Sequence, residues 1–245
     1  MTDSPIRQVW PGRTSGPLDD EAIAELYGRA AHLRVNFVTS LDGAAHLDGY
    51  SAGLSGGPDK RVFAVLRMLC DALVVGAGTL RHEGYRALRL DDRRRGWRRE
   101  RGLTEFPTLV VVSGTLDLDP AQAAFAEAPV RPLVLTHAGA PAHRRAALAP
   151  VADVLTLGED ALDLPAALRA LHERGHRQLL CEGGPALLGA LTAADLVDEL
   201  CLTVSPLLAG PGASRITTGP PGPPRAMTLR HVLTADDVLL LRHSR

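Results

Sequence analysis

Three loops of this sequence combine glycine with residues that can bind a charged ligand, and the last of them has the most such residues. An apolar run at 179–181 stops at Glu182-Gly183-Gly184, and Pro185 favours a helix start directly afterwards. Two glycines admit close approaches that a Cβ would block, and free N–H groups at a helix start suit a phosphate. Glu182 beside such an anion site needs a partner of its own, for example a substrate N–H. The same letters also describe an ordinary tight connection.

The second loop follows the apolar run 72–75 and contains Gly76, Gly78 and Thr79. This stretch resembles part of a dinucleotide-binding fingerprint but lacks the full G-x-G-x-x-G, so it is not a Rossmann signature. Thr79 could instead cap a short helix. Two glycine-rich strand ends in one sheet still favour a ligand site, because ligands of open α/β sheets lie at the carboxyl ends of strands.

The third loop follows the apolar strand pattern at 33–39. It begins with Ser40-Leu41-Asp42-Gly43, which is typical of a turn in which the Asp side chain bonds nearby backbone. The stretch 46–57 that follows is rich in glycine and serine, and it is long for a simple connection. We expect the space beside these small residues to hold something other than protein, although a flexible surface loop would fit the same composition.

The composition is that of a globular protein without a strong charge bias. The chain has 245 residues, 45% of them hydrophobic, and a formal net charge of −1 with neutral His, so a general affinity for nucleic acid or anionic membranes has no support. No apolar run approaches the roughly 18–20 residues of a membrane span, and residues 1–16 lack a signal core, so we expect a cytoplasmic protein. Cys70, Cys181 and Cys201 lie among apolar neighbours and are expected to be buried thiols. No CxxC or HExxH motif indicates a metal site.

Short apolar runs alternate with helical patterns from residue 33 onward, which indicates a mainly parallel sheet with helices on both faces. A helix is predicted over 58–70, where Val62, Val65 and Leu66 recur at helical spacing. The last two strands are joined only by residues 234–236, so they should form an antiparallel hairpin. The predicted strands are 33–39, 71–76, 108–113, 132–136, 151–156, 178–182, 199–205, 226–233 and 237–243.

The order of the three loops is a further signal. SLDG at 40–43 follows the first strand, LVVGAGT at 73–79 follows the first long helix, and EGGPALLGAL at 182–191 is followed by LVDEL and SPLLAG. Across roughly 33–243 this combination resembles the reductase family of riboflavin biosynthesis. That family comprises the C-terminal part of bifunctional deaminase-reductases and their stand-alone relatives, among which the actinobacterial type is most similar to this chain. The sequence contains no zinc-deaminase signature.

The resemblance implies a fold, a reaction and a cofactor. The implied fold is dihydrofolate-reductase-like: a three-layer α/β fold with a twisted, mostly parallel mixed sheet and an antiparallel C-terminal hairpin, in a homodimer. We therefore expect an N-terminal arm and short helix at 1–30 and a single reductase domain at 31–245. The implied reaction uses NADPH to reduce the ribosyl group of a 5-amino-6-(5-phosphoribosylamino)pyrimidine to a ribityl chain. The pyrimidine is either the uracil or the 2,5-diamino form.

The resemblance also assigns roles to residues. The chemistry of the implied reaction adds two catalytic candidates: Asn36 would orient the substrate by hydrogen bonds, and Asp42 is either a proton shuttle or only a turn residue. The implied substrate-binding residues are Ser51, Arg67, Arg86, Arg89 and Glu182, with the arginines meeting the phosphate and Glu182 the pyrimidine or ribityl part. The implied cofactor-binding residues are Val38, Gly53, Gly78, Thr79, Glu83, Ser113, Gly183, Gly184, Pro185, Ala186, Leu187, Leu188, Gly189 and Ala190. Of these, 184–190 hold the pyrophosphate and Ser113 meets the 2′-phosphate.

Departures from the family pattern leave alternatives open. Asn36 stands where bifunctional bacterial members often carry Lys, and GLS at 53–55 replaces their W-I-T run, so the pyrimidine is not fixed. A reductase of a pterin or dihydrofolate on the same fold, or an NADP(H)-binding protein without turnover, fits as well. The arginines discriminate, since a pterin has no ribose phosphate and its reduction should be indifferent to Arg67, Arg86 and Arg89.

Overall fold

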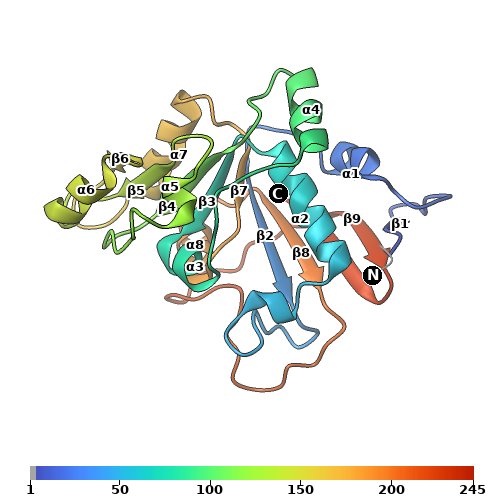
Figure 1. Cartoon of the computed structure of the whole chain (residues 1–245). Helices are drawn as coiled ribbons and strands as arrows, with labels where there is room; N and C mark the ends of the chain where they lie inside the picture. The colour runs from blue at the N-terminus through green and yellow to red at the C-terminus, as the bar shows by residue number, and fades with distance from the viewer. Residues whose placement is uncertain (1–3) are drawn as a thin grey trace.

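A computed structural model describes residues 4–245 and contains one ten-stranded sheet (Figure 1). The strands lie in the order β1-β9-β10-β8-β2-β7-β3-β4-β5-β6. Their bounds are β1 Arg7–Trp10, β2 Leu33–Thr39, β3 Ala72–Gly76, β4 Thr108–Val112, β5 Leu133–Thr136, β6 Asp153–Thr156, β7 Leu179–Cys181, β8 Glu199–Val204, β9 Thr228–Ala235 and β10 Val238–Ser244. Every strand predicted from the sequence is present, with ends shifted by at most two residues.

The body of the sheet is parallel and its C-terminal edge is antiparallel, as expected. The strands from β8 through β2, β7, β3, β4 and β5 to β6 pair in parallel. β10 joins β8 antiparallel, and β9 and β10 form the predicted hairpin. Asp236 in the hairpin turn has φ +51°, a left-handed conformation that Asp tolerates better than most residues. The expected mixed α/β sheet is therefore confirmed.

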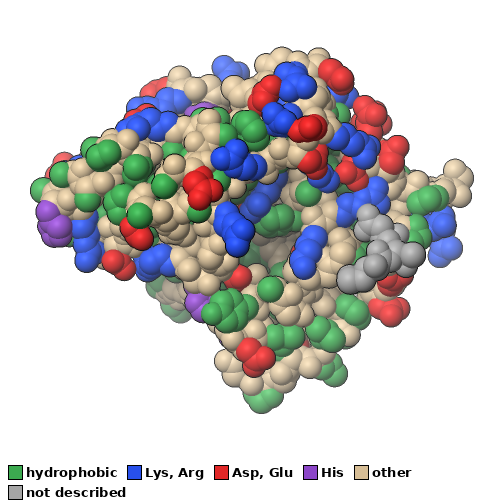
Figure 2. Space-filling view, in the orientation of Figure 1, with side chains coloured by type: hydrophobic (Ala, Val, Ile, Leu, Met, Phe, Trp, Pro, Cys, Tyr) green, Lys and Arg blue, Asp and Glu red, His purple; other side chains and the backbone are tan. Residues whose placement is uncertain are grey.

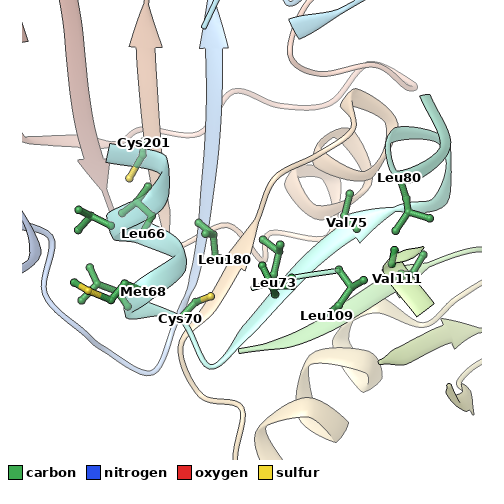
Figure 3. Packing of buried hydrophobic residues seen from close by; sticks show 14 of the residues in the cluster. Leu66, Met68, Cys70, Leu73, Val75, Leu80, Leu109, Val111, Leu180 and Cys201 are labelled. Carbon is green, nitrogen blue, oxygen red and sulfur yellow. The ribbon is translucent and has the colours of Figure 1, made fainter. Parts of the chain in front are cut away.

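Helices cover both faces of the sheet. Along β3, Leu73 and Val75 pack in one apolar cluster with α2 (Gly57–Leu69), whereas Ala72 and Val74 pack in a second cluster with α7 and α8, because side chains alternate along a strand. Figure 3 shows the first cluster, with Leu73 and Val75 near Leu109 of the neighbouring strand. The other helices are α1 Asp20–Tyr27, α3 Ala77–His82, α4 Asp92–Glu100, α5 Ala123–Ala126, α6 Ala142–Leu148, α7 Leu164–Glu173, α8 Pro185–Ala193 and the short 3₁₀ helix Ser51–Gly53.

The N-terminal segment adds a strand to the same sheet. β1 pairs antiparallel with β9, and Ile6 and Tyr27 are buried in the cluster that contains α2. Asp19 caps α1 by accepting a hydrogen bond from the Ala22 N–H at 2.8 Å. The sequence predicted α1 but not β1, because the letters RQVW are too few and too polar to form a strand pattern.

A buried ionic cluster of Arg34, Glu199 and Arg242 lies where β2, β8 and β10 meet. Arg34 is 1% exposed and Glu199 2%. Arg34 binds one carboxylate oxygen of Glu199, and Arg242 donates to the other at 2.8 Å. The two arginines also donate to the carbonyls of Tyr27 and Leu26. The cluster therefore ties the end of α1 to the amino ends of β2 and β8.

Candidate active site

A cavity of about 520 Å³ opens at the carboxyl ends of β2, β3 and β7, with α2 and α3 beside it. This volume is within the usual range for small-molecule sites, ~300–1,000 Å³. Figure 2 shows a hollow on this face with Lys and Arg side chains around it. The lining residues are Asn36, Phe37, Val38, Ala45, His46, Gly49, Ser51, Ala52, Ser55, Asp59, Lys60, Phe63, Arg67, Leu73, Gly78, Thr79, His82, Glu83, Tyr85, Arg86, Ala87, Leu88, Glu182, Gly184 and Pro185.

The cavity brings together most of the residues assigned to the substrate and some of those assigned to the cofactor. Ser51, Arg67, Arg86 and Glu182 line it, and so does Asn36. The assigned cofactor residues that line it are Val38, Gly78, Thr79, Glu83, Gly184 and Pro185. The assigned residues that do not line it are Asp42, Gly53, Arg89, Ser113, Gly183, Ala186, Leu187, Leu188, Gly189 and Ala190.

Glu182 is held in the cavity wall by an arginine and a tyrosine. Arg67 donates from Nε and Nη2 to its two carboxylate oxygens at 2.7 and 2.6 Å, and the Tyr85 hydroxyl donates to Oε2 at 2.9 Å. The Glu182 side chain is 1% exposed and that of Arg67 24%. Burial lowers the pKa of Arg67, but the Glu182 carboxylate outweighs burial and raises it, so Arg67 stays charged. The Arg67 charge, assigned above to a substrate phosphate, is therefore already paired.

The two glycine-rich strand ends pack directly against each other. The Gly76 N–H donates to the Gly183 carbonyl at 2.7 Å, which joins the loop after β3 to the loop after β7. A Cβ on Gly184 would lie 2.3 Å from the Thr79 hydroxyl, and Gly183 has φ +103° and would meet Phe37 at 3.2 Å. Glycine at these positions is thus required for the packing of the two loops, besides any ligand that they hold.

Helix α8 presents its N-terminus to the cavity through Gly184 and Pro185. Among residues 4–245, the backbone N–H groups of Ala186 and Leu187 find no hydrogen-bond acceptor, which leaves them for an anion. Gly189 has a different neighbour, since its Cβ would lie 2.0 Å from the carbonyl oxygen of Thr218. Its small size is therefore required by the loop that crosses α8 there.

Asp42 lies outside the cavity and fastens the loop that follows β8. It accepts hydrogen bonds from the Ser40 hydroxyl and from the backbone N–H groups of Ala209, at 3.1 Å, and Gly210, at 2.8 Å. These bonds, led by that from Ser40, lower the pKa of Asp42 to about 2. The geometry favours the turn role of Asp42 over the proton shuttle.

Two further assigned residues are engaged elsewhere. Arg89 donates to the carbonyl of Glu127 at 2.8 Å, and Ser113 is 4% exposed, with its Oγ accepting the Leu116 N–H at 3.0 Å. The sequence placed Ser113 at a strand end correctly, but it could not show that the chain turns back onto the hydroxyl.

The loop over the cavity is fixed to the end of α3. Glu83 accepts the Ser51 N–H at 3.1 Å, His82 bonds the carbonyl of Gly49 at 2.8 Å, and its ring stacks on Tyr50 with centroids 4.5 Å apart. Glu83, assigned above to the cofactor, thus holds the 49–51 segment in place at the cavity.

Comparisons with known proteins place the chain in a family. A model of the RibD C-terminal domain family matches residues 31–241. The chain belongs to this family. The 2,5-diamino-6-ribosylamino-4(3H)-pyrimidinone 5′-phosphate reductase of Archaeoglobus fulgidus is 32% identical over 177 residues, 72% of this chain and 80% of that protein. The enzyme of the same name from Methanothermobacter thermautotrophicus is 30% identical, over 72% of this chain and 78% of that protein.

Solved structures of the same kind share the fold. A pyrimidine reductase-like protein from Corynebacterium diphtheriae superposes with a TM-score of 0.81 at 26% identity, covering 87% of this chain and 91% of that one. The riboflavin biosynthesis reductase Rib7 of Saccharomyces cerevisiae has a TM-score of 0.63 at 15% identity, covering 87% and 89%. These matches confirm the family and the fold class inferred from the sequence, and they make the chain an oxidoreductase.

A reductase of the RibD C-terminal family implies a nicotinamide cofactor, and the cavity has features that fit one. A Cβ on Gly78 would face open space, and the N-terminus of α8 offers N–H donors beside it. Within residues 4–245 no three His, Cys, Asp or Glu side chains gather as metal ligands, and no helix is long and apolar enough to cross a membrane.

The cysteines are the buried free thiols that the sequence predicted. Burial raises the pKa of Cys70 and of Cys181 to about 12, so neither supplies a thiolate near neutral pH.

Among the polar or aromatic residues of the cavity wall that sequence reasoning missed are Asp59, Lys60, Phe63 and Tyr85. A signal was available for two of them. Asp59, Phe63 and Arg67 recur every four residues along α2, which places them on one side of the helix. The apolar residues of the same helix give the stronger pattern, and they predict only the face that is buried in the core. Phe63 supports Arg67, whose guanidinium lies 4.1 Å from the Phe63 ring centroid.

Proposed function

We propose that this chain is an NADPH-dependent reductase that converts the ribosyl group of 2,5-diamino-6-ribosylamino-4(3H)-pyrimidinone 5′-phosphate to a ribityl chain. The observation that carries the proposal is the cavity, which joins two glycine-rich strand ends to the buried Glu182 carboxylate and to the cations Lys60 and Arg86. The archaeal relatives, 30% and 32% identical, are named for this substrate. A homodimer, which the resemblance implies, is part of the proposal and is tested by light scattering.

The cofactor supplies the hydride, and the protein's task is to hold it beside the sugar. Gly78, Thr79, Gly184 and the start of α8 are the residues that fit its phosphates, because Gly78 faces open space and the start of α8 has free N–H donors. NADPH rather than NADH is our proposal. Calorimetric titration checks it, and equal affinities for the two cofactors would contradict it.

We assign the substrate phosphate to Arg86 and Lys60. Both side chains are exposed at the cavity, and within residues 4–245 neither has a carboxylate partner, whereas Arg67 is paired with Glu182. Arg67 then acts by fixing Glu182, whose Oε1 accepts only one hydrogen bond from the protein and has room for another from the substrate.

Asn36 provides a neutral hydrogen-bonding group at the floor of the cavity. It lies on β2, is 7% exposed and lines the cavity, so its amide can orient the sugar by both donating and accepting hydrogen bonds. Opening of the N-glycoside also moves a proton, and Asp42 stands outside the cavity, so we propose no step through it.

The deciding experiment follows NADPH oxidation with three substrates: the 2,5-diamino phosphoribosyl pyrimidine, its deaminated uracil counterpart and dihydrofolate. The proposal expects turnover of the first and none of dihydrofolate. In addition, Arg86→Ala should raise KM for the pyrimidine by roughly 10- to 100-fold, the usual cost of losing a bond between two charged groups.

Each alternative function has its own signature in that assay. A pterin reductase would consume dihydrofolate and be indifferent to Arg86→Ala. An NADP(H)-binding protein without turnover would bind the cofactor and oxidise none of it with any of the three compounds.

A further inference from the structure

Asp59 is a second buried carboxyl group in the cavity, and the reaction as assigned so far makes no use of it. It lies in the first turn of α2, is 5% exposed and lines the cavity. Thr203 on β8 donates its hydroxyl to Oδ1 at 2.6 Å, and Ser55 donates to Oδ2. In the described part of the chain, no Lys, Arg or His nitrogen lies within salt-bridge distance of this carboxyl.

The two carboxyl groups of the cavity, Glu182 and Asp59, differ in how many hydrogen-bond acceptor sites remain free and in whether a cation neutralises them. Glu182 accepts three hydrogen bonds and is neutralised by Arg67, whereas Asp59 accepts two from uncharged hydroxyls, one on each oxygen. An ionised carboxylate has about four acceptor sites, so each oxygen of Asp59 keeps roughly one. Burial raises the pKa of Asp59, and the hydrogen bonds from Ser55 and Thr203 and the charge of Lys60 offset only part of that rise. Asp59 thus lacks the donors that a buried carboxylate needs.

The ligand that supplies this need carries two N–H groups side by side in one plane. The C2–N3 edge of a 2-amino-4(3H)-pyrimidinone has this form, since the 2-amino group and N3–H both donate on the same side of the ring. The geometry points to Asp59 as the residue that recognises the 2-amino–N3–H edge of the pyrimidine and so selects the aminated substrate. This inference rests on the function proposed above and adds the identity of the accepted ring.

The position of Asp59 along α2 is consistent with the pyrimidine binding at Asp59 and the sugar binding near Glu182. Asp59 and Arg67 are eight residues apart, which is roughly 12 Å along a helix. The pyrimidine at Asp59 and the sugar near Glu182, which Arg67 holds, would therefore lie side by side along the same wall.

The deaminated ring is disfavoured at an ionised Asp59. In the uracil form C2 carries a carbonyl oxygen in place of the amino group, and two acceptors would then face each other without a proton. An asparagine at position 59 would reverse the preference between the two rings. Its amide donates to the C2 carbonyl while its oxygen still accepts from N3–H, so Asp59→Asn should favour the uracil form.

The experiment measures kcat/KM of the full-length protein, with NADPH, for the aminated and the deaminated phosphoribosyl pyrimidines. Wild type should prefer the aminated form by roughly 10- to 100-fold, and Asp59→Asn should remove or invert that preference. Asp92→Asn is the matched control. Asp92 also lies in the first turn of a helix, but its side chain is 93% exposed on α4, so the ratio should stay at the wild-type value.

The possible outcomes separate the role of Asp59 from the proposed function. Turnover of the aminated pyrimidine with the same ratio in wild type and Asp59→Asn overturns the role of Asp59 and leaves the proposed function intact. Turnover of neither pyrimidine overturns the proposed function and the basis of this inference with it. Turnover of dihydrofolate alone is one form of that result and likewise overturns both.

A second variant covers the case in which Asp59→Asn does not fold. Asp59→Ser removes the carboxylate and cannot offer the paired donor and acceptor of an amide. It should lose the preference for the aminated ring without inverting it, and an unchanged ratio overturns the inference.

Discussion

Glu182 and Glu199 are two buried glutamates held by arginine at opposite ends of the sheet. Glu182 follows β7 at the cavity and binds Arg67, while Glu199 begins β8 and lies between Arg34 and Arg242. Their side chains are 1% and 2% exposed, so burial does not distinguish them. Their partners differ. Within residues 4–245 the only arginine on Glu182, Arg67, is 24% exposed at the cavity, whereas Glu199 binds the fully buried Arg34, 1% exposed, as well as Arg242, which is 19% exposed.

A buried ion pair therefore indicates a ligand-binding site only where one of its partners is exposed to a cavity. In the closed cluster of Arg34, Glu199 and Arg242, three charged groups lose hydration, and only their mutual attraction and the surrounding carbonyls offset that loss. Removing one of the three leaves the charge of the others uncompensated. In the open pair of Arg67 and Glu182, water or a ligand can take the place of a lost hydrogen bond. We therefore expect the closed cluster to determine stability, and the open pair to determine activity.

The largest effect is expected from Glu199→Gln. Without the carboxylate, the buried Arg34 is left unpaired beside the like charge of the partly exposed Arg242, so the free energy of unfolding should fall by about 3–5 kcal/mol. Urea unfolding followed by circular dichroism measures it. Glu105→Gln is the matched control, since Glu105 also binds two arginines but on the surface, and its unfolding midpoint should stay at the wild-type value. Equal midpoints for the two variants would show that the closed cluster is not a stability element.

A pH effect of similar origin comes from His231, which is 3% exposed beside the closed cluster. Burial, with help from Arg242, lowers the pKa of His231 to about 4, below its ordinary value near 6.5. The unfolded chain therefore binds a proton that the folded state refuses, and stability is lost as pH falls through the window from about 6.5 to 4, by at most roughly 3 kcal/mol. His231→Phe, which keeps the edge-to-face contact with Tyr27, should flatten this slope. The test is urea unfolding across that range, and a slope equal to that of wild type would contradict the assignment.

The closed cluster also shows what could and could not be read from the sequence. All strands except β1, the C-terminal hairpin and the two glycine-rich loops follow from local patterns, and the structure confirms them. Arg34 and Glu199 are 165 residues apart, so their contact depends on which strands are neighbours, and no local pattern encodes that. The same limit concealed the pairing of Arg67 with Glu182, which lies 115 residues away along the chain.

The third effect is on activity. Glu182→Gln breaks the ionic part of the open pair, so kcat/KM should fall by roughly 10- to 100-fold, as expected for a lost bond to a charged group. Its loss of unfolding free energy should be smaller than that of Glu199→Gln, because the Arg67 head can turn toward the cavity and bind water. Both quantities are measured on the same preparations. A stability loss as large as that of Glu199→Gln, with activity unchanged, would make the two glutamates equivalent and remove the comparison.

The smallest effect is expected from Asp42→Asn, which tests a carboxylate that is neither buried nor in the cavity. Its depressed pKa, about 2, reflects hydrogen bonds from Ser40, Ala209 and Gly210, so it stays ionised and accepts bonds at any pH near neutrality. Any stability that these bonds add is present above about pH 4 and is lost only as pH falls toward 2. Asparagine keeps one acceptor oxygen, so kcat should stay within about twofold of wild type and its pH profile should not move. A proton shuttle would behave otherwise, since its loss costs about 100-fold or more in kcat. Such a loss, with the loop intact by circular dichroism, would place Asp42 in the chemistry and would require the 40–43 turn to reach the cavity when substrate binds.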